Sequence, residues 1–571
     1  MRQVVQDFGT GDVRLEDVAT PTLRDGFARV RAAASVVSVG TERAIVELAR
    51  RSLLGKARAR PDLVARVWKK LRRDGLSAAV RTVKDRLGAP MPLGYAAAGV
   101  VTEATPRATP FVVGDRVACA GAGFANHAEE LAVPRNLLAL VPAGVSLADA
   151  AFATLGAIAL NAHRAAGLGV GDRVAVVGAG LLGTLTVRIA RAAGVRVLAV
   201  DLDPERRARA LRDGAEVVAA PEDAAAAGRA WTGRAGVDAV VIAAATADES
   251  PVSLAADLVR KAGVVVALGD VPLRLPRRLY YAKEATLRVA TSYGPGRYDR
   301  GYEEGGRDYP LAYVRWTAGR NLEAFLRLLA SGGVRVDDLA EDHPFDDAVA
   351  VYERLLSGPS PSRAPRFVHR DGPVDRAPTV PAPTTAIVAA PGAPRAALVG
   401  AGAFARGTLW PALLEAGLAP VVVTAATGAS AADAARRLRF PRSSTDAIAA
   451  LEAPDVDVVV VATPHDTHAD LVARALRAGK HVFVEKPLAI DGTGLAAVVG
   501  ALEGARGILT VGFNRRFSPA AARARAFLDA VAGPCVATYR VNAGPAPDVG
   551  WHGDARISGG RLVGEAVPHP E

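Results

Sequence analysis

The sequence predicts an α/β protein that contains two parallel-sheet nucleotide-binding domains. Two segments, residues 172–203 and 395–428, each begin with an apolar strand that runs into a glycine-rich turn and a helix. Between them lies a proline-rich run, residues 371–395, of the kind that links domains. The 571 residues also exceed what one hydrophobic core usually supports. We therefore expect a multidomain chain with its main boundary at this linker.

The pattern of strands, turns and helices divides the chain further. Glycine, proline and β-branched residues are frequent before residue 150, which predicts a small β domain ahead of the first parallel sheet. The expected parts are a β domain at 1–150 with a basic helical insertion at about 48–88, a first Rossmann domain at 151–290, a return to the β domain at 291–370, the linker at 371–395, a second Rossmann domain at 396–515, and a shortened α+β part at 516–571.

Composition excludes several classes of protein. Hydrophobic residues make up 50% of the chain and charged residues 23%, which is typical of a globular protein. The only two cysteines, Cys119 and Cys535, cannot form a disulfide framework or a four-cysteine zinc site. Charges interrupt the N-terminal segment, and no run of about 18 apolar residues occurs. We expect a cytoplasmic protein without a membrane partner.

The net charge of +11 is concentrated between Arg50 and Arg86, where apolar residues recur at helical spacing among Lys and Arg. A solvated helical face and a nucleic-acid contact are both consistent with such a charge run. Nucleic-acid binding would require several base-stacking aromatic residues interleaved with the basic ones, or a known module; the segment has the single aromatic residue Trp68 and no known module. We therefore predict no nucleic-acid partner.

The first glycine-rich turn predicts a dinucleotide site. Its glycines have the spacing G-x-G-x-x-G directly after a strand, so that the helix N-terminus faces the phosphates. Asp201 ends the next strand, about where an acidic residue binds the ribose hydroxyls and repels a 2′-phosphate. This favours NAD, although Arg206 and Arg207 follow closely and Asp201 could merely begin a turn. The predicted cofactor-binding residues are Gly178, Gly180, Leu181, Leu182, Gly183 and Asp201.

Residues 1–369 resemble the medium-chain, zinc-type alcohol dehydrogenase superfamily, which joins a GroES-like β domain to a Rossmann domain. The family's Cys-Gly-Thr-Asp motif reads Val39-Gly40-Thr41-Glu42 here, and its Gly-His-Glu motif reads Gly94-Tyr95-Ala96. The zinc ligands are thus missing, and we expect no bound metal. By position, Thr41 and Tyr95 are the catalytic candidates that would replace the metal with hydrogen-bond donors. Equally, they could be a turn threonine and a packed tyrosine.

The stretch from Ser292 to Trp316 is dense in Tyr, Arg and Gly and resembles a signature of bi-domain oxidoreductases. Tyr293, Arg297 and Tyr298 are substrate-binding candidates, because aromatic and guanidinium groups suit a polar, sugar-sized pocket. The alternative is that they only fix a long loop. Both interpretations stay open.

The second turn has Gly400 and Gly402, with Ala405 in the third place. The next strand ends at Thr424 without an acidic residue, so this site is open to NAD or NADP.

From Arg395 onward the sequence resembles the Gfo/Idh/MocA family, whose members oxidise or reduce sugars, inositols and related polyols. The resemblance rests on the glycine turn, GKHVFVEKP at 479–487 and GFNRRFSP at 512–519. It implies that Lys486 sits beside the nicotinamide and orients the reacting hydroxyl. His465 and His468 have the spacing of a metal pair, but no further ligand is evident. Further cofactor-site candidates are Thr463, His468 and Glu485, and substrate candidates are Asn514 and Arg515.

The C-terminal segment departs from that family. Its second catalytic residue is a histidine after a Gly-Gly segment, and here the matching position falls near Pro568, with His569 one residue late. We therefore expect an incomplete second catalyst. The strand-like residues 537–544 would then leave unpaired edges that favour homo-oligomer formation.

Together the two resemblances imply an NAD(P)-dependent dehydrogenase or reductase that acts on the CH–OH group of a small carbohydrate-like substrate without zinc. A protein of a different class remains open, in which the dinucleotide is bound without turnover and the chain acts as a sensor or scaffold.

Overall fold

The computed structural model describes residues 1–52, 55–56, 90–358, 361–370, 372, 374–382, 390–531, 533–536, 538, 540 and 554–560. These residues fall into two compact units. The first unit extends to Val374, and the second begins at Asp375 and also includes Val18–Thr22. The predicted basic insertion lies outside the described residues from position 57 onward. Within the described part, no helix combines the length and the apolar character needed to cross a bilayer.

The β part of the first unit is built from two sheets whose strands are antiparallel except for the parallel pair β15–β16. One has the strand order β2-β1-β4, and the other has the order β15-β16-β3-β5-β6-β8, with β7 also paired to β3. Strand β16 comes from the far end of the unit and pairs with β3 through Arg366 and Val36. The strands are β1 (Arg2–Asp7), β2 (Val13–Asp17), β3 (Phe27–Val36), β4 (Pro90–Pro92), β5 (Ala96–Ala104), β6 (Arg116–Ala120), β7 (Glu130–Pro134), β8 (Leu138–Leu140), β15 (Ala340–Pro344) and β16 (Ala364–Val368).

Several helices accompany these sheets. One of them, α1, directly follows β3, and its N-terminal turn is important for the site described below. The helices are α1 (Val39–Arg50), α5 (Leu147–Ala150), α6 (Ala153–Ala166), α12 (Arg300–Glu303), α13 (Ala318–Ala330) and α14 (Ala348–Ser357).

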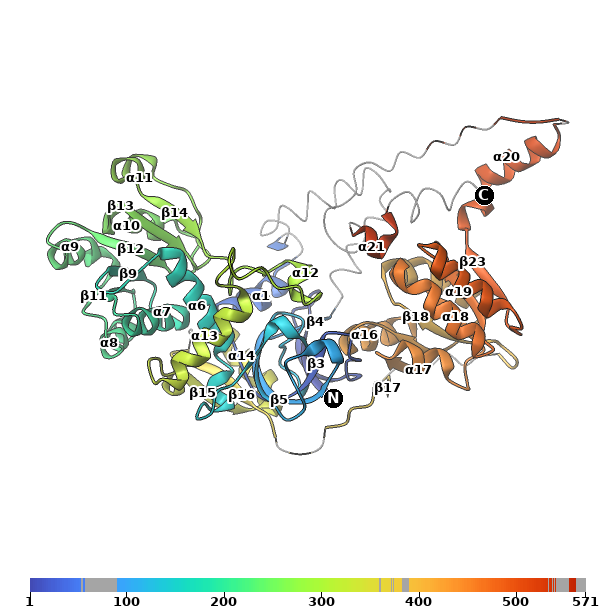
Figure 1. The fold of residues 1–571 in the computed structure, drawn as a ribbon, viewed down its shortest axis with the longest axis horizontal. Helices are drawn as coiled ribbons and strands as arrows, with labels where there is room; N and C mark the ends of the chain where they lie inside the picture. Colours follow the sequence, from blue (N-terminus) through green and yellow to red (C-terminus); the bar gives the residue numbers. More distant parts are fainter. Residues whose placement is uncertain are drawn as a thin grey trace. The chain divides into compact units, whose positions relative to one another are not determined.

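A parallel sheet with the order β11-β10-β9-β12-β13-β14 forms the rest of the first unit (Figure 1). Successive residues of β9 pack on opposite faces: Val174 against α6, α7 and α8, and Ala175 against α9, α10 and α11. This is the doubly wound Rossmann arrangement. Its elements are β9 (Arg173–Val177), α7 (Leu181–Ala192), β10 (Arg196–Val200), α8 (Pro204–Arg212), β11 (Val217–Ala219), α9 (Pro221–Trp231), β12 (Val237–Ile242), α10 (Ser250–Leu258), β13 (Val259–Ala267), α11 (Arg277–Lys283) and β14 (Thr286–Val289).

The second unit repeats this order in its sheet, β17-β20-β19-β18-β21-β22-β23, with β17 antiparallel at one edge (Figure 1). Helices α17, α18 and α19 cover one face, and α15 and α16 cover the other. The elements are β17 (Thr379–Pro381), β18 (Arg395–Val399), α15 (Trp410–Glu415), β19 (Ala419–Thr424), α16 (Gly428–Leu438), β20 (Arg442–Ser444), α17 (Ala447–Glu452), β21 (Val458–Val461), α18 (His468–Arg477), β22 (His481–Glu485), α19 (Gly492–Leu502), β23 (Leu509–Gly512), α20 (Pro519–Asp529) and α21 (Ala555–Ser558).

The two units differ at the third position of the glycine pattern. A Cβ on Gly183 would lie 1.8 Å from the carbonyl oxygen of Gly178, so α7 can approach β9 only because this residue is glycine. In the second unit the corresponding residue is Ala405, and the helix begins with a wider π-helical turn, Ala405–Leu409. The wider turn accommodates the extra methyl group. Both sheets agree with the predicted α/β class.

Candidate functional site

A cleft of about 1100 Å³ lies at the carboxyl ends of β9, β10 and β12 in the first unit. Its walls come from the glycine turn, from Asp201, from Ala243 and Ala244 after β12, and from the N-terminal turn of α1. In a doubly wound sheet, ligands bind at this edge where the strand order reverses. The first glycine pattern is therefore placed where a dinucleotide would lie.

The glycine turn itself has room for a pyrophosphate. Gly178 has a φ of +96°, which a side chain would strain, and its N–H donates to the carbonyl of Val200 at 2.8 Å. A Cβ on Gly180 would meet no atom closer than Arg206 Nη1 at 3.9 Å. The face of Gly180 is thus open space in front of the α7 N-terminus, which suits an anionic group. Leu181 and Leu182 also line the cleft.

Two backbone N–H groups, one of them in the glycine turn, hold the Asp201 carboxylate. Its Oδ2 accepts the N–H of Ala179 at 2.7 Å, and its Oδ1 accepts the N–H of Asp203 at 2.9 Å. Arg206 Nη1 approaches Oδ2 at 4.0 Å. Both carboxylate oxygens are fixed and the side chain lines the cleft, so the negative charge has a defined place beside the glycine turn.

The opposite wall of the cleft contains Thr41, which is exposed at the start of α1. Tyr95 forms side-chain hydrogen bonds with Ser38 and Thr41, so the two sequence candidates are in contact. Burial, reinforced by the negative charge of Glu42, raises the pKa of Tyr95 above its ordinary value. At neutral pH the phenol therefore keeps its proton and can act as a donor.

Sequence reasoning missed the buried network that anchors this wall. Glu42 is only 1% exposed; its Oε1 accepts the N–H of Ser38 at 2.8 Å, and its Oε2 accepts the Tyr352 hydroxyl. His127 Nε2 lies 3.2 Å from the same Oε2, and His127 Nδ1 lies 2.8 Å from Ser35 Oγ. Desolvation and the Glu42 charge raise the pKa of Tyr352 well above its ordinary value. Because Glu42 fixes the N-cap of α1, it fixes Thr41.

The positions that would hold zinc in an alcohol dehydrogenase do not fit a metal. Val39 and Ala96 carry no donor atom, and Tyr95 is engaged with the two neighbouring hydroxyls. Within the described ranges, no group of three or more His, Cys, Asp or Glu side chains could hold a metal ion.

The candidate substrate residues after position 292 form a cluster of their own. The Tyr293 hydroxyl donates to Glu303 Oε1 at 3.0 Å, and Arg297 Nη1 donates to the same oxygen at 2.7 Å. Burial raises the pKa of Tyr293 far above its ordinary value, so this phenol stays protonated. Tyr298 is 72% exposed, with the Arg297 guanidinium 4.0 Å from its ring centroid. The residues that line the cleft do not include any of these three.

In the second unit, the predicted cofactor residues lie at the carboxyl ends of adjacent strands. Gly400 follows β18, Thr463 follows β21, and Lys486 follows Glu485 at the end of β22. Gly400 has a φ of +96°, and a Cβ on Gly402 would meet nothing within 4 Å, so this turn is as open as the first. Burial raises the pKa of Glu485. The strand order therefore brings the predicted site together.

His468 ties two of these strand ends to each other. Its ring is buried; Nδ1 lies 2.7 Å from the Pro487 carbonyl and Nε2 lies 2.9 Å from the Thr463 carbonyl. Burial lowers the pKa of His468, so the neutral ring donates to one carbonyl at a time. His465 Nδ1 instead contacts the Ser558 carbonyl at 2.9 Å. The Nδ1 contact thus positions Pro487, the residue after Lys486, and the Nε2 contact positions Thr463.

The remaining candidates are placed only in part. Asn514 and Arg515 lie exposed in a short turn, Asn514–Phe517, after β23. His569 lies outside the described residues, as do most of the strand-like residues 537–544.

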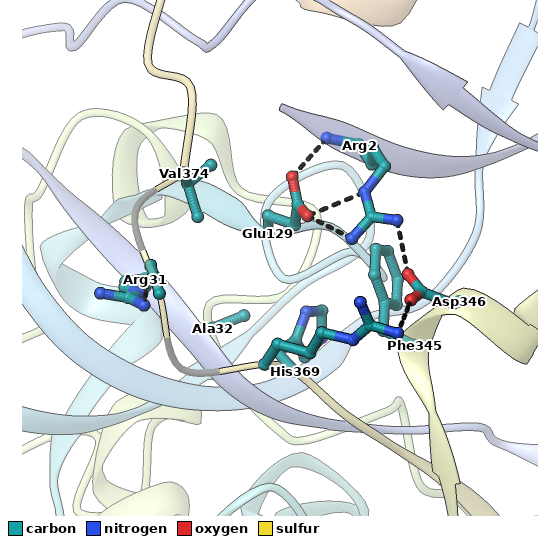
Figure 2. A pocket seen from close by; sticks show the side chains of 10 residues that line it. Arg2, Arg31, Ala32, Glu129, Phe345, Asp346, His369 and Val374 are labelled. Atoms are coloured by element: carbon teal, nitrogen blue, oxygen red, sulfur yellow. Dashed lines mark hydrogen bonds and ion pairs between the residues drawn. The ribbon is translucent and has the colours of Figure 1, made fainter.

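A smaller cavity of about 220 Å³ lies in the β part of the first unit (Figure 2). Arg2 pairs with Glu129 at 2.7 Å and with Asp346 at 2.5 Å, and Arg370 pairs with Asp346 at 2.6 Å. His369 forms part of its lining, 9% exposed and stacked on Phe345. Carboxylates of the cavity thus compensate Arg2 and Arg370, and the cavity shares no residue with the glycine turns.

Two family descriptions match parts of the chain. Residues 182–304 match "Zinc-binding dehydrogenase", and residues 394–513 match the Gfo/Idh/MocA "Oxidoreductase family, NAD-binding Rossmann fold". The chain is a fusion of these two kinds of module. The first unit is thus the alcohol-dehydrogenase-like module and the second is the Gfo/Idh/MocA-like module, which confirms both resemblances and the two nicotinamide-dinucleotide-binding folds.

Three curated relatives illustrate the similarity. Levoglucosan dehydrogenase of Pseudarthrobacter phenanthrenivorans is 33% identical over 154 residues, 26% of this chain and 40% of that protein. Inositol 2-dehydrogenase of Rhizobium meliloti is 50% identical over 74 residues, 13% of this chain and 22% of that protein. Probable D-xylulose reductase A of Arthroderma otae is 28% identical over 304 residues, 47% of this chain and 79% of that protein. The chain thus spans less than half of the first two.

Proposed function

We propose that the chain is an NAD(P)-dependent oxidoreductase that transfers hydride to or from the carbinol carbon of a sugar-like or polyol substrate. The observation that carries the proposal is the pair of open glycine turns, each at the switch point of a sheet with the same strand order. The names of the relatives, a levoglucosan dehydrogenase, an inositol dehydrogenase and a xylulose reductase, support a carbohydrate-like substrate.

In the alcohol-dehydrogenase-like module, Thr41 relays the proton of the reacting hydroxyl group and Tyr95 positions Thr41. A bound nicotinamide supplies the hydride acceptor or donor. During oxidation the exposed Thr41 hydroxyl accepts a hydrogen bond from the substrate hydroxyl and relays the released proton to solvent water, and its contact with Tyr95 orients it. In the reverse direction the same relay delivers a proton from solvent water through Thr41 to the carbonyl oxygen, while the protonated Tyr95 phenol keeps Thr41 in place. No zinc takes part in this scheme.

In the Gfo/Idh/MocA-like module, Lys486 orients the reacting hydroxyl. It follows β22, and His468 contacts the carbonyl of the next residue, Pro487, as well as that of Thr463. Asn514 and Arg515 are proposed substrate contacts, and His569 would be the second acid or base. With His569 displaced by one residue from the family's position, we propose that this module is the weaker catalyst.

The experiment is a binding titration followed by a substrate screen. NADH and NADPH binding is followed by nicotinamide fluorescence, and cyclic sugars, inositols and open-chain polyols are then tested by absorbance. Turnover that falls in Thr41→Val assigns the reaction to the first unit, and turnover that falls in Lys486→Met assigns it to the second. Binding without turnover on any of these substrates would instead support a non-catalytic sensor or scaffold, which the loss of the zinc ligands favours for the first unit.

Zinc independence has its own test. Val39 and Ala96 offer no ligand atoms, so elemental analysis of the purified protein should find no stoichiometric zinc. One zinc per chain would contradict this part of the proposal.

We also propose that the chain self-associates through the edge of the first parallel sheet. Strand β14 is the last in its sheet; its residue Val289 is 62% exposed, and Tyr281 in α11 is 73% exposed. Light scattering should report a mass above that of one chain, and Val289→Lys should lower it.

A further inference from the structure

The same backbone hydrogen bond occurs in both glycine turns and defines the equivalent positions of the two units. In the first unit the N–H of Gly178 donates to the carbonyl of Val200 at 2.8 Å, and in the second unit the N–H of Gly400 donates to the carbonyl of Thr424 at 3.2 Å. The residue that follows each carbonyl is Asp201 in the first unit and Ala425 in the second. The position that carries the ribose-facing carboxylate in one unit therefore carries a methyl group in the other.

The difference continues into the next helix. Two residues further on, the N-cap is Asp203 in the first unit and Thr427 in the second. Thr427 Oγ1 accepts the N–H of Ser430 at 3.3 Å and lies 2.9 Å from the Ser430 hydroxyl. The sequence has no carboxylate from Ala425 to Ala432. Hydroxyl groups and the N-terminal turn of α16 thus replace two negative charges.

A positively charged side chain, Arg406, lies between the second glycine turn and the first turn of α16. Arg406 Nε donates to the carbonyl of Ala401, inside the glycine turn, at 2.7 Å. Its Nη2 donates to the carbonyl of Ser430 at 3.2 Å, and its Nη1 donates to Asp433 Oδ2 at 2.7 Å. The guanidinium therefore bridges the glycine turn and the first turn of α16, where the adenosine ribose would lie in a Rossmann fold.

Arg406 shares its carboxylate partner, Asp433, with two other arginines. Asp433 is 5% exposed and is shared by Arg406 at 2.7 Å, Arg437 at 2.9 Å and Arg436 at 4.0 Å. Arg406 therefore does not have this carboxylate to itself. Ala426 and Thr427 are exposed beside it, whereas Gly428 is buried, with the Ala19 carbonyl 2.1 Å from where its Cβ would lie.

We propose that the second unit is selective for NADP(H), with the 2′-phosphate held by Arg406 and the hydroxyls of Thr427 and Ser430, while the first unit is selective for NAD(H). This rests on the proposed function, in which both units bind a nicotinamide dinucleotide. Arginine and hydroxyl donors at a helix N-terminus form charge-assisted hydrogen bonds to phosphate. The chain would then hold both cofactors at the same time.

The test measures binding by the full chain with the first site closed. Gly180→Val places a side chain in the open space of the first turn, so it blocks the pyrophosphate without a clash in the free protein. In this variant, NADPH should bind at least tenfold more tightly than NADH by nicotinamide fluorescence. The preference should decrease with added salt, because a phosphate contact at the surface is screened.

Three further substitutions in the Gly180→Val background locate the contact. Arg406→Gln should reduce the NADPH preference about tenfold. Arg437→Gln is the matched control: it removes the same charge and another contact of Asp433, but it lies about 10 Å along the helix from Ser430 and should leave the preference unchanged. Ala425→Asp, which leaves Arg406 in place, should lower NADPH affinity at least tenfold and keep NADH affinity.

The outcomes distinguish failure of the NADP(H) assignment from failure of the proposed function of the second unit. Equal affinity for NADPH and NADH in the Gly180→Val chain, or a preference that survives both Arg406→Gln and Ala425→Asp, would overturn the NADP(H) assignment and leave the proposed function intact. A Gly180→Val chain that binds neither dinucleotide, while its circular dichroism matches that of the unaltered chain, would overturn the proposed function of the second unit as well.

Discussion

Replacing Asp201 with serine should narrow the difference between the NAD and NADP affinities of the first unit. The Asp201 carboxylate is fixed by the N–H groups of Ala179 and Asp203, so its charge cannot swing away from a 2′-phosphate. Serine removes that charge. It also leaves the N–H of Ala179 without its acceptor, so NAD affinity should fall modestly as well.

The expected size follows from Coulomb's law. A phosphate with about two negative charges, placed about 5 Å from the carboxylate in a medium of effective dielectric constant about 40, is repelled by about 3 kcal/mol. Arg206, 4.0 Å from the carboxylate, offsets part of this repulsion. We therefore expect the NAD to NADP affinity ratio to fall by about tenfold to a hundredfold in Asp201→Ser.

The assay uses the Gly402→Val chain, in which the second turn is blocked, and measures NADH and NADPH binding by fluorescence. Asp203→Ser is the control: Asp203 is a carboxylate on the same loop, but it caps α8 by accepting the N–H of Glu205 at 2.8 Å. Asp203→Ser should therefore change the NAD to NADP affinity ratio much less than Asp201→Ser does. An unchanged ratio in a folded Asp201→Ser chain would show that Asp201 does not face the ribose, and the reasoning would be wrong.

Other predictions concern stoichiometry, catalysis and acid stability. The unaltered chain should bind two dinucleotides, and Gly180→Val or Gly402→Val should each reduce this to one by calorimetry, because both added side chains enter open space; two sites remaining in either variant would contradict the assignment. Lys486→Met should lower turnover in the second unit at least tenfold while dinucleotide affinity stays within about twofold, and an unaltered rate on a substrate of that unit would remove Lys486 from the mechanism. Burial lowers the pKa of His369 to about 3, so the unfolded chain binds its proton more readily between pH 6.5 and 3 and stability is lost as the pH falls through that range. Between pH 7 and pH 4, His369→Leu should therefore lose about 3 kcal/mol less free energy of unfolding than the unaltered protein, measured by denaturant titration of the first unit. An equal loss in the two proteins would refute this.

Local sequence patterns were sufficient for the parts of the site that form over short separations. The turns at Gly178 and Gly400 each depend on a strand, three small residues and a helix that follow one another directly, so spacing alone predicts them. Asp201 could be predicted because the next strand of the unit must end at the same edge of the sheet.

Contacts between distant segments could not be read from the sequence. Glu42 contacts His127 and Tyr352, which lie 85 and 310 residues away in the sequence, and no local sequence pattern predicts such contacts. The density of Tyr and Arg after position 292 was consistent with a substrate pocket and with a fixed loop, and in the structure Tyr293 and Arg297 share the carboxylate of Glu303. Composition indicated a polar cluster there but not what the cluster contacts.

The long separation between Glu42 and Tyr352 also bears on how the first unit is made. During synthesis, the parallel sheet from β9 to β14 has all its strands before the ribosome reaches Tyr352, so it can fold while the wall that carries Thr41 is still incomplete. Strand β3 lacks its neighbour β16 until residue 368 has emerged. Until then, an open β edge and a Glu42 that lacks its Tyr352 contact coexist beside a finished nucleotide fold. A nascent chain stalled before Tyr352 should therefore protect its Rossmann sheet from protease while α1 is still cut, which makes this return segment the step that completes the cleft.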